Sequence, residues 1–537
     1  MKPSNSVESR DTWLGTNKFM CIASSLMVFV FVVFAVTNVK LSNDIFNTLN
    51  GWITTNFSWY YILILSGVLA FAVWVAFSRF GQIRLGADDE TPEFSFTAWF
   101  SMLFSCAIGT GLLFWSIAEP ITHMQGNPFL DMKGIEPNTV EAAQMAIEIT
   151  MFHWGIHGWA VYIMVGLCLA YFCYRRGLPL TVRSGLYPLL GERVNGPIGH
   201  AVDLLAIFST LFGTATTLGL GVSQMNAGLN YLFGMSISTE SQLILIAVVS
   251  LIATVSAVSG VGRGIKVLSI WNIRLSTLVI LFFVIAGPTV FLFDLAVSAI
   301  GDYAVSFASM GFWVDLDPER QWQGWWTLFY WGWWLSWGPL VGMFIARISR
   351  GRTIRQFLLS ALVIPPLGGF LWIVIFGGTA LHIDLFQGGQ LTEVVNADMT
   401  QALYSTIEAL GVDSMTTLVA ALSTFLILTW FVTSADSGTL VISTIVSKGC
   451  TNPPNWLRAA WGVGLGVISG ILLVSGGLDA LKTASIVAAF PFSIVFIFMC
   501  WALFKGLKDE EQGIRYVEAD LAKPITAEQS AGRTQAQ

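Results

Sequence analysis

Long runs of apolar residues alternate with short polar segments along almost the whole chain. A helix needs about 20 mostly apolar residues to cross the hydrocarbon core of a bilayer. Twelve stretches are about that long, and we expect each to form a membrane-spanning helix: 19–38, 59–79, 97–118, 148–173, 200–220, 241–262, 269–293, 324–346, 357–381, 414–447, 457–475 and 483–505. A shorter amphipathic stretch, 295–309, is expected to lie flat on the outer face or against a neighbouring subunit.

The composition supports a chain that is almost entirely embedded in a membrane. Its 537 residues are 55% hydrophobic and only 11% charged, with a mean hydropathy of +0.69. Soluble proteins carry about 25% charged residues, so a soluble enzyme, a nucleic-acid binder and a disordered scaffold are excluded. The first apolar run has no small-residue cleavage site and is longer than a signal peptide's apolar region, so we expect it to remain as a helix.

The distribution of basic residues predicts the orientation. If both termini are cytoplasmic, most Lys and Arg residues fall on the inner side, and the exceptions are Lys40, Lys133, Arg320 and Lys482. Membrane proteins concentrate positive charge in their cytoplasmic loops. The pattern therefore favours an even number of spans, with polar cytoplasmic tails at residues 1–17 and 508–537.

Two of the predicted helices contain residues that interrupt helices. The third span includes Gly109 and Gly111, and the eighth includes Gly338 and Pro339. Paired interruptions five spans apart are typical of inverted-repeat transporters, in which unwound backbone binds substrate and ions near the middle of the bilayer. Close helix packing through small residues is the alternative interpretation.

Aromatic residues cluster on one face of two of the predicted spans. Trp154, Trp159 and Tyr162 fall within about 140° of arc on a helix, and Trp331, Trp334 and Trp337 recur every three residues. Several rings can cage a quaternary ammonium group through cation–π attraction. Ordinary packing of aromatic residues in the core or at the membrane interface is the alternative.

Hydroxyl and acidic side chains in apolar spans are candidates for binding a small cation. Thr433 and Ser434 are adjacent, and Thr210 and Thr214 are four residues apart on one helix face. Sodium prefers hard oxygen ligands, although such hydroxyls commonly bond back to their own helix. Asp436 is a functional candidate because an acid is costly inside a membrane, or it caps a helix end.

Two histidines in the fourth span are spaced four residues apart. His153 and His157 could bind zinc at that spacing, but the sequence places no third ligand nearby, which favours packing or hydrogen bonding. The chain also shows no clustered catalytic set. We therefore expect no catalytic residues and no enzyme activity.

Longer motifs resemble the betaine/choline/carnitine transporter (BCCT) family. The segment Tyr330–Pro339, continuing from Gly342 to Arg355, carries the most specific similarity, and the resemblance covers about residues 15–507. The segments Phe152–Tyr162, Phe114–Pro120 and Thr433–Gly438 also resemble the family.

The resemblance implies an all-α membrane protein of twelve transmembrane helices with a LeuT-type 5+5 inverted repeat preceded by two extra helices. It also implies a homotrimer in the cytoplasmic (inner) membrane of a bacterium, in contact with membrane lipid and without a nucleic-acid partner. The expected parts are a cytoplasmic tail 1–17, two additional helices 18–80, a first repeat 95–293, an extracytoplasmic segment 294–323, a second repeat 324–507 and a cytoplasmic tail 508–537.

The resemblance also assigns the binding residues. The aromatic box would consist of Trp154, Trp159, Tyr162 and Trp334, with Trp331, Trp333 and Trp337 on the entry path. The substrate carboxylate would meet the backbone of Ala107, Ile108, Gly109, Thr110 and Gly111. Sodium would bind at two sites, one formed by Ser105, Ile108, Thr433 and Ser434 and the other by Thr210 and Thr214.

Departures from the family pattern refine the expected substrate. Many betaine-type members have Gly-Met-Gly-Ile-Gly where this chain has Ala-Ile-Gly-Thr-Gly at 107–111. Choline-type members often carry Asp at the position of Gly111, so its absence favours a zwitterion that brings its own carboxylate. Sodium-independent exchangers place an arginine where Asn272 stands here, with Arg274 two residues on, and Asn272 favours sodium coupling.

The resemblance and these departures together predict a sodium-coupled symporter. It would import a zwitterionic quaternary ammonium or sulfonium compound, such as glycine betaine or dimethylsulfoniopropionate, with sodium as the coupling ion and no cofactor. A sodium-independent exchanger for carnitine and betaines, and proton-coupled choline uptake, stay open as alternatives.

Overall fold

The computed structural model describes residues 12–13, 16–106, 109–259, 264–317, 319–514 and 516. These residues are mostly α-helical, which confirms the predicted all-α class. A short antiparallel hairpin precedes the first helix, in which β1 (Thr12–Trp13) pairs with β2 (Thr16–Asn17).

The first half of the chain forms eleven α-helices and four short helical turns within the described residues. The α-helices are α1 (Lys18–Thr37), α2 (Val39–Phe77), α3 (Phe96–Cys106), α4 (Thr110–Gln125), α5 (Pro128–Lys133), α6 (Val140–Trp154), α7 (Ile156–Ala170), α8 (Tyr187–Leu190), α9 (Pro197–Phe233), α10 (Thr239–Ser259) and α11 (Gly264–Ala286). The turns are η1 (Arg79–Gln82), η2 (Tyr171–Arg175), η3 (Val182–Leu186) and η4 (Gly191–Asn195).

The second half continues in the same way. Its elements are α12 (Thr289–Gly311), α13 (Trp322–Trp325), α14 (Thr327–Ile348), α15 (Ile354–Gln387), α16 (Leu391–Asp398), η5 (Met399–Gln401), α17 (Ala402–Ala409), α18 (Asp413–Val446) and α19 (Asn455–Glu511).

The helices agree closely with the predicted spans. Nine helical segments of the described chain are long and apolar enough to cross a membrane, and each predicted stretch falls mainly on helix. The last two predicted spans form the two halves of α19, which kinks at Gly476 and Gly477. Gly477 has a φ of 61°, a conformation that only glycine adopts without strain.

The predicted break in the third span is present. Helix α3 ends at Cys106 and α4 begins at Thr110, with Gly109 in an extended conformation between them. Ala107 and Ile108 lie outside the described residues, as do the side chains of Ser105 and Cys106. The break leaves the first backbone N–H groups of α4 without partners in their own helix.

The predicted break in the eighth span is wrong. Helix α14 is continuous across Gly338 and Pro339, and its glycines serve packing instead. A Cβ at Gly332 would lie 2.9 Å from the Ile486 Cα, and one at Gly342 would lie 2.9 Å from the Gly166 nitrogen. Proline removes a single helix hydrogen bond, and neighbouring helices tolerate such a loss in membranes.

A second interruption falls where none was predicted. Gly155 has an extended conformation and separates α6 from α7. The Tyr303 hydroxyl of α12 accepts a hydrogen bond from the Ile156 N–H at 3.2 Å, so it satisfies one of the amides that the break leaves free. A Cβ at Gly155 would lie only 2.6 Å from that hydroxyl.

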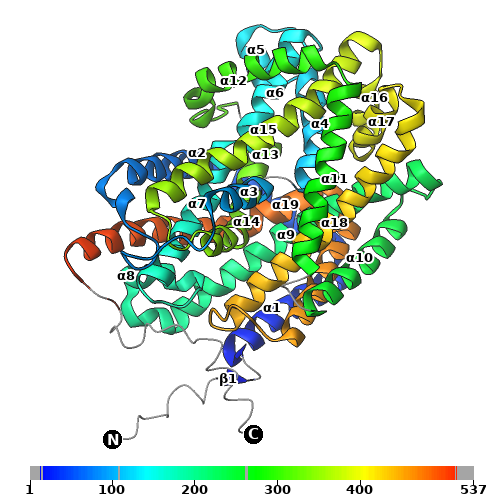
Figure 1. Cartoon of the computed structure of the whole chain (residues 1–537). Helices are drawn as coiled ribbons and strands as arrows, with labels where there is room; N and C mark the ends of the chain where they lie inside the picture. Colours follow the sequence, from blue (N-terminus) through cyan, green and yellow to red (C-terminus); the bar gives the residue numbers. More distant parts are fainter. Residues whose placement is uncertain are drawn as a thin grey trace, which may run out of the picture.

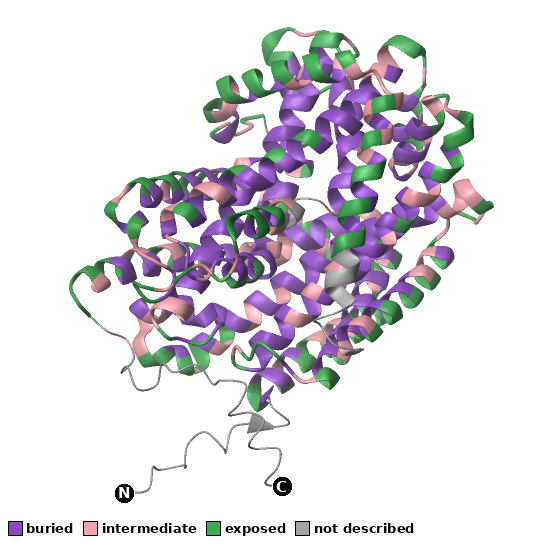
Figure 2. Ribbon diagram, viewed as in Figure 1, coloured by how far each residue is buried: buried purple, intermediate pink, exposed green. Residues whose placement is uncertain are grey.

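The helices pack into one body around a buried centre (Figures 1 and 2). Helix α14 packs against α7, α9 and α19, and α9 also packs against α18. Helix α12 contains the predicted amphipathic stretch but is longer, and it packs on α6 and α15. Its outer side keeps Val297 and Val305 at 75% and 87% exposure.

Candidate functional site

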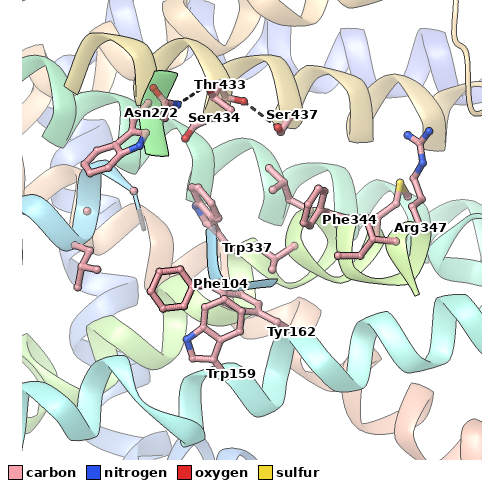
Figure 3. A pocket seen from close by; sticks show the side chains of 18 of the residues that line it. Phe104, Trp159, Tyr162, Asn272, Trp337, Phe344, Arg347, Thr433, Ser434 and Ser437 are labelled. Carbon is pink, nitrogen blue, oxygen red and sulfur yellow. Dashed lines mark hydrogen bonds between the residues drawn. The ribbon is translucent and has the colours of Figure 1, made fainter. Parts of the chain in front are cut away.

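A cavity of about 860 Å³ lies among α4, α7, α11, α14 and α18. It extends from the helix break at Gly109 to Arg347 and Arg350 near the end of α14, with Glu93 beside them. Figure 3 shows Trp159 and Tyr162 on one wall, with Thr433 and Ser434 on the wall opposite. The cavity therefore joins three predicted features, which are the rings, the break and one hydroxyl pair.

Four of the predicted box rings lie together on this cavity. The Trp334 ring centroid is 5.0 Å from that of Trp154 and 5.8 Å from that of Tyr162, and Trp159 lies 5.3 Å from Tyr162. All three pairs meet edge to face. Each ring is at most 8% exposed, so a cation bound among them would be largely desolvated, which strengthens cation–π attraction.

Glycines on the neighbouring helices make room for these rings. A Cβ at Gly158 would lie 2.5 Å from the Trp334 Nε1, and a Cβ at Gly111 would lie 2.5 Å from the Trp333 ring and 3.3 Å from Trp154. Real Cβ atoms do not approach so closely. A side chain at either position would displace one of these rings.

The other predicted tryptophans divide into two groups. Trp333 and Trp337 line the cavity, and Trp333 stacks on Trp334 with centroids 5.4 Å apart. Trp331 does not line it. Its ring packs against Phe152 and His157 behind the box.

The first predicted hydroxyl pair lies on the cavity wall. Thr433 donates a hydrogen bond to the Thr429 carbonyl at 2.8 Å and accepts one from the Asn272 amide at 3.2 Å. Ser434 and Asn272 line the cavity beside it. The structure thus brings Asn272 into direct contact with the predicted ion site.

The second predicted hydroxyl pair lies away from the cavity. Thr210 and Thr214 are fully buried on α9, and neither hydroxyl has a hydrogen-bond partner among the described residues. A Cβ at Gly438 would lie 3.1 Å from Thr214, so Thr214 faces α18. Unsatisfied buried hydroxyls are costly, which makes these two hydroxyls unusual.

Asp436 is not a helix cap. It lies inside α18, and its carboxylate accepts a hydrogen bond from Ser256 of α10 at 2.8 Å. The acid therefore ties α18 to α10.

A buried polar cluster that the sequence did not reveal stands directly behind the box. Its centre is Glu119, whose carboxylate lies 2.6 Å from the His153 Nδ1 and 3.4 Å from the His123 Nε2. These three side chains could hold a metal ion. His157 is not among them, and the contacts of His153 with Glu119 and Thr327 agree with the hydrogen bonding expected for this histidine. An acid within an apolar span is the signal that could have identified Glu119.

Lys482 was expected between two spans, and the structure places it inside a helix instead. It is only 8% exposed within α19. Its ammonium lies 4.9 Å from the Trp115 and Trp326 centroids and 5.0 Å from that of Phe329. The chain thus holds one of its own cations in an aromatic cage, by the same physics that the box would use.

A helical bundle with a central cavity, a helix break at that cavity and rings arranged around it defines a multi-pass membrane transporter for a small solute. The chain belongs to the BCCT family, the betaine/carnitine/choline family of transporters. The model of this family matches residues 19–512. This family consists of transporters, so the protein is not an enzyme.

Three relatives illustrate the similarity. A probable glycine betaine transporter of Desulfitobacterium hafniense is 41% identical, over 91% of this chain and 97% of its own. The glycine betaine transporter OpuD of Bacillus subtilis is 42% identical, over 92% and 94%. The high-affinity choline transport protein of Escherichia coli is 42% identical, over 88% and 69%.

Proposed function

We propose that the protein is a sodium-coupled symporter that imports a zwitterionic quaternary ammonium or sulfonium compound. Glycine betaine is the first candidate and dimethylsulfoniopropionate the second. The observation that carries the proposal is the set of four buried rings, Trp154, Trp159, Tyr162 and Trp334, around a cavity that also reaches the helix break.

The rings and the break suit the two ends of such a substrate. An onium group has no N–H or S–H to donate, so ring faces recognise it through charge and dispersion. A carboxylate finds free backbone N–H groups and a favourable dipole at the start of a helix, and α4 begins beside the cavity at Thr110. The glycine betaine transporters among the relatives support a substrate of this kind.

Sodium would bind where hydroxyls and freed carbonyls meet. Thr433 and Ser434 face the cavity from α18, and carbonyls at the end of α3, near Ser105 and Ile108, would complete the site. Sodium there would tie the broken third span to α18 and favour closure around the substrate. Thr210 and Thr214 would form the second site.

The proposal includes the expected architecture. Twelve spans would form two inverted five-helix repeats, 95–293 and 324–507, after two additional helices in 18–80, with the segment 294–323 extracytoplasmic. The tails 1–17 and 508–537 would be cytoplasmic, and three copies would associate in the inner membrane. Because the cavity reaches Arg347 and Arg350, which the charge pattern assigns to the cytoplasmic side, the conformation described here would be open to the inside.

Uptake into proteoliposomes tests the proposal. Labelled glycine betaine is presented with and without an inward sodium gradient, and unlabelled dimethylsulfoniopropionate, carnitine and choline compete. We expect uptake that requires sodium and is competed best by zwitterions. Uptake that ignores sodium and rises with substrate preloading would instead establish an exchanger, and competition by choline alone would establish a choline carrier.

Trp334→Leu is the variant that tests the box, and Trp331→Leu is its matched control. Both residues are tryptophans of α14, but only Trp334 lines the cavity. The Trp334 variant should raise the KM strongly, whereas the Trp331 variant should leave it near the wild-type value. Equal effects on KM would refute the box assignment.

A further inference from the structure

We propose that Glu119 is the positioning residue of the onium box, and that its charge makes the box select a cation over a neutral group of the same shape. The inference rests on the proposed function. It goes further by assigning a role to an acidic side chain that does not itself line the cavity.

Glu119 has no exposed surface, and donors from two other helices surround its carboxylate. The Oε2 atom accepts a hydrogen bond from the Trp154 Nε1–H at 3.2 Å and another from the Tyr330 hydroxyl. The Oε1 atom lies 2.6 Å from the His153 Nδ1. Glu119 belongs to α4, Trp154 and His153 to α6, and Tyr330 to α14, so one carboxylate joins three helices behind the box.

The same cluster orients two of the four box rings. Trp154 is held directly through its indole N–H. Trp334 is held by His153, whose backbone carbonyl accepts the Trp334 Nε1–H at 2.9 Å. An indole has a single N–H donor, so each of these hydrogen bonds fixes the direction in which the ring faces.

The pattern of donors fits a carboxylate that accepts hydrogen bonds at both of its oxygens. Trp154 can only donate, which makes Oε2 an acceptor. The His153 Nε2 lies 3.1 Å from the Thr327 hydroxyl, and when that hydroxyl donates to Nε2, the Nδ1–H of His153 donates to Oε1. In this arrangement Trp154, Tyr330 and His153 all donate to the carboxylate, which needs no proton of its own.

A buried negative charge at the edge of the box changes what the box attracts. The face of an aromatic ring is weakly negative and its edge weakly positive. The carboxylate accepts a hydrogen bond from the indole N–H on that edge, so the positive edge of Trp154 is held against the carboxylate. In a medium of low dielectric this charge acts over a longer range than in water. A cation gains from both effects, whereas a neutral group gains only from shape and dispersion.

The caged Lys482 supplies a positive charge close to the same cluster. The Trp326 ring packs against His123 at 4.4 Å between centroids and against the Lys482 ammonium at 4.9 Å. One ring thus connects the histidine beside Glu119 to an internal cation. Loss of the carboxylate would remove a negative charge that offsets this lysine near the box.

The test compares two ligands of the same shape. Glycine betaine carries a trimethylammonium group, and 3,3-dimethylbutanoate carries a tert-butyl group in its place, with the same carboxylate. Binding of each to the purified full-length protein is measured by quenching of tryptophan fluorescence with sodium present. We compare the ratio of the two dissociation constants. A general loss of structure would weaken the binding of both ligands and leave this ratio unchanged.

We expect Glu119→Gln to reduce the preference for glycine betaine by about tenfold or more, because it removes the charge and turns one acceptor into a donor. Glu119→Asp keeps the charge and should retain a larger part of the preference. Glu148→Gln is the matched control, since Glu148 is a buried acid of α6 whose partner is Ser306 on α12, and it should leave the ratio unchanged.

An unchanged ratio in Glu119→Gln would overturn the inference while leaving the proposed function intact. Wild-type protein that shows no preference for glycine betaine would overturn both. If Glu119→Gln does not fold, Trp154→Phe replaces it, because phenylalanine keeps an aromatic ring but loses the N–H that bonds Glu119. We expect a reduced ratio for that variant too, and an unchanged one would again overturn the inference.

Discussion

The space beside Trp334 offers the sharpest steric test of the box. Gly158 lies one turn after the break at Gly155, and a Cβ there would lie 2.5 Å from the Trp334 Nε1 and 2.6 Å from its Cδ1. Gly158→Ala should therefore push the Trp334 ring out of position and strain its 2.9 Å hydrogen bond to the His153 carbonyl.

The size of the effect follows from the loss of one ring. A desolvated cation–π contact contributes about 2 kcal/mol, and about 1.4 kcal/mol corresponds to a tenfold change in affinity. Losing the Trp334 contact should thus weaken glycine betaine binding roughly 30-fold. The overpacking itself should cost about 1–3 kcal/mol of stability.

Binding is measured by tryptophan fluorescence, and folding by size-exclusion chromatography and thermal unfolding. Gly67→Ala is the control, because a Cβ at that position in α2 meets no atom within 4 Å. It should change neither affinity nor Tm by much. A folded Gly158→Ala protein that binds glycine betaine within about threefold of wild type would refute the assignment of Trp334 to the box.

Three further variants test other parts of the account. Replacing Thr433 and Ser434 with alanine together should raise the sodium concentration needed for half-maximal uptake by about tenfold or more, since two hard oxygen ligands are lost; an unchanged sodium dependence would contradict this site. Asp203→Asn should destabilise the protein by about 3–5 kcal/mol, because it breaks a buried ion pair. In that pair the Arg183 Nε lies 3.1 Å from the Asp203 carboxylate. Thermal unfolding measures the loss of stability, and a wild-type Tm would contradict this prediction. Glu90→Gln should change the stability by less than about 1 kcal/mol. Arg350 lies 2.5 Å from Glu90, but the Arg350 side chain is 42% exposed, and exposed ion pairs contribute little. A large fall in Tm would contradict this prediction.

Sequence patterns predicted the helices and most of the rings that line the cavity, because both depend on local order. Apolar runs of about 20 residues predict spans directly, and helical periodicity places Trp154, Trp159 and Tyr162 on one face. The break in the third span was also local, since Gly109 and Gly111 are two apart. These features need no knowledge of which helices are neighbours.

The errors arose where tertiary contacts decide. The glycines of α14 suggested a break, but Gly332 and Gly342 are where other helices approach closely, and the helix remains continuous. A break does occur at Gly155, where Tyr303 of α12 accepts the Ile156 N–H. Nothing in the sequence near either position tells these two uses of glycine apart.

The polar groups behind the box were the hardest to foresee. Glu119 acquires its role from Trp154, His153 and Tyr330 on two other helices. Lys482 is caged by rings from α4 and α14, although its position between two predicted spans suggested an outer loop. Only the fold brings these residues together.

Electrical recording distinguishes sodium symport from exchange. Glycine betaine carries no net charge, so its transport with sodium moves positive charge, whereas exchange of one zwitterion for another moves none. Proteoliposomes on a solid support are given a sudden rise in glycine betaine in sodium or in potassium buffer. We expect an inward positive current in sodium that vanishes in potassium and in Trp334→Leu. The absence of current in sodium, with labelled uptake intact, would contradict sodium symport.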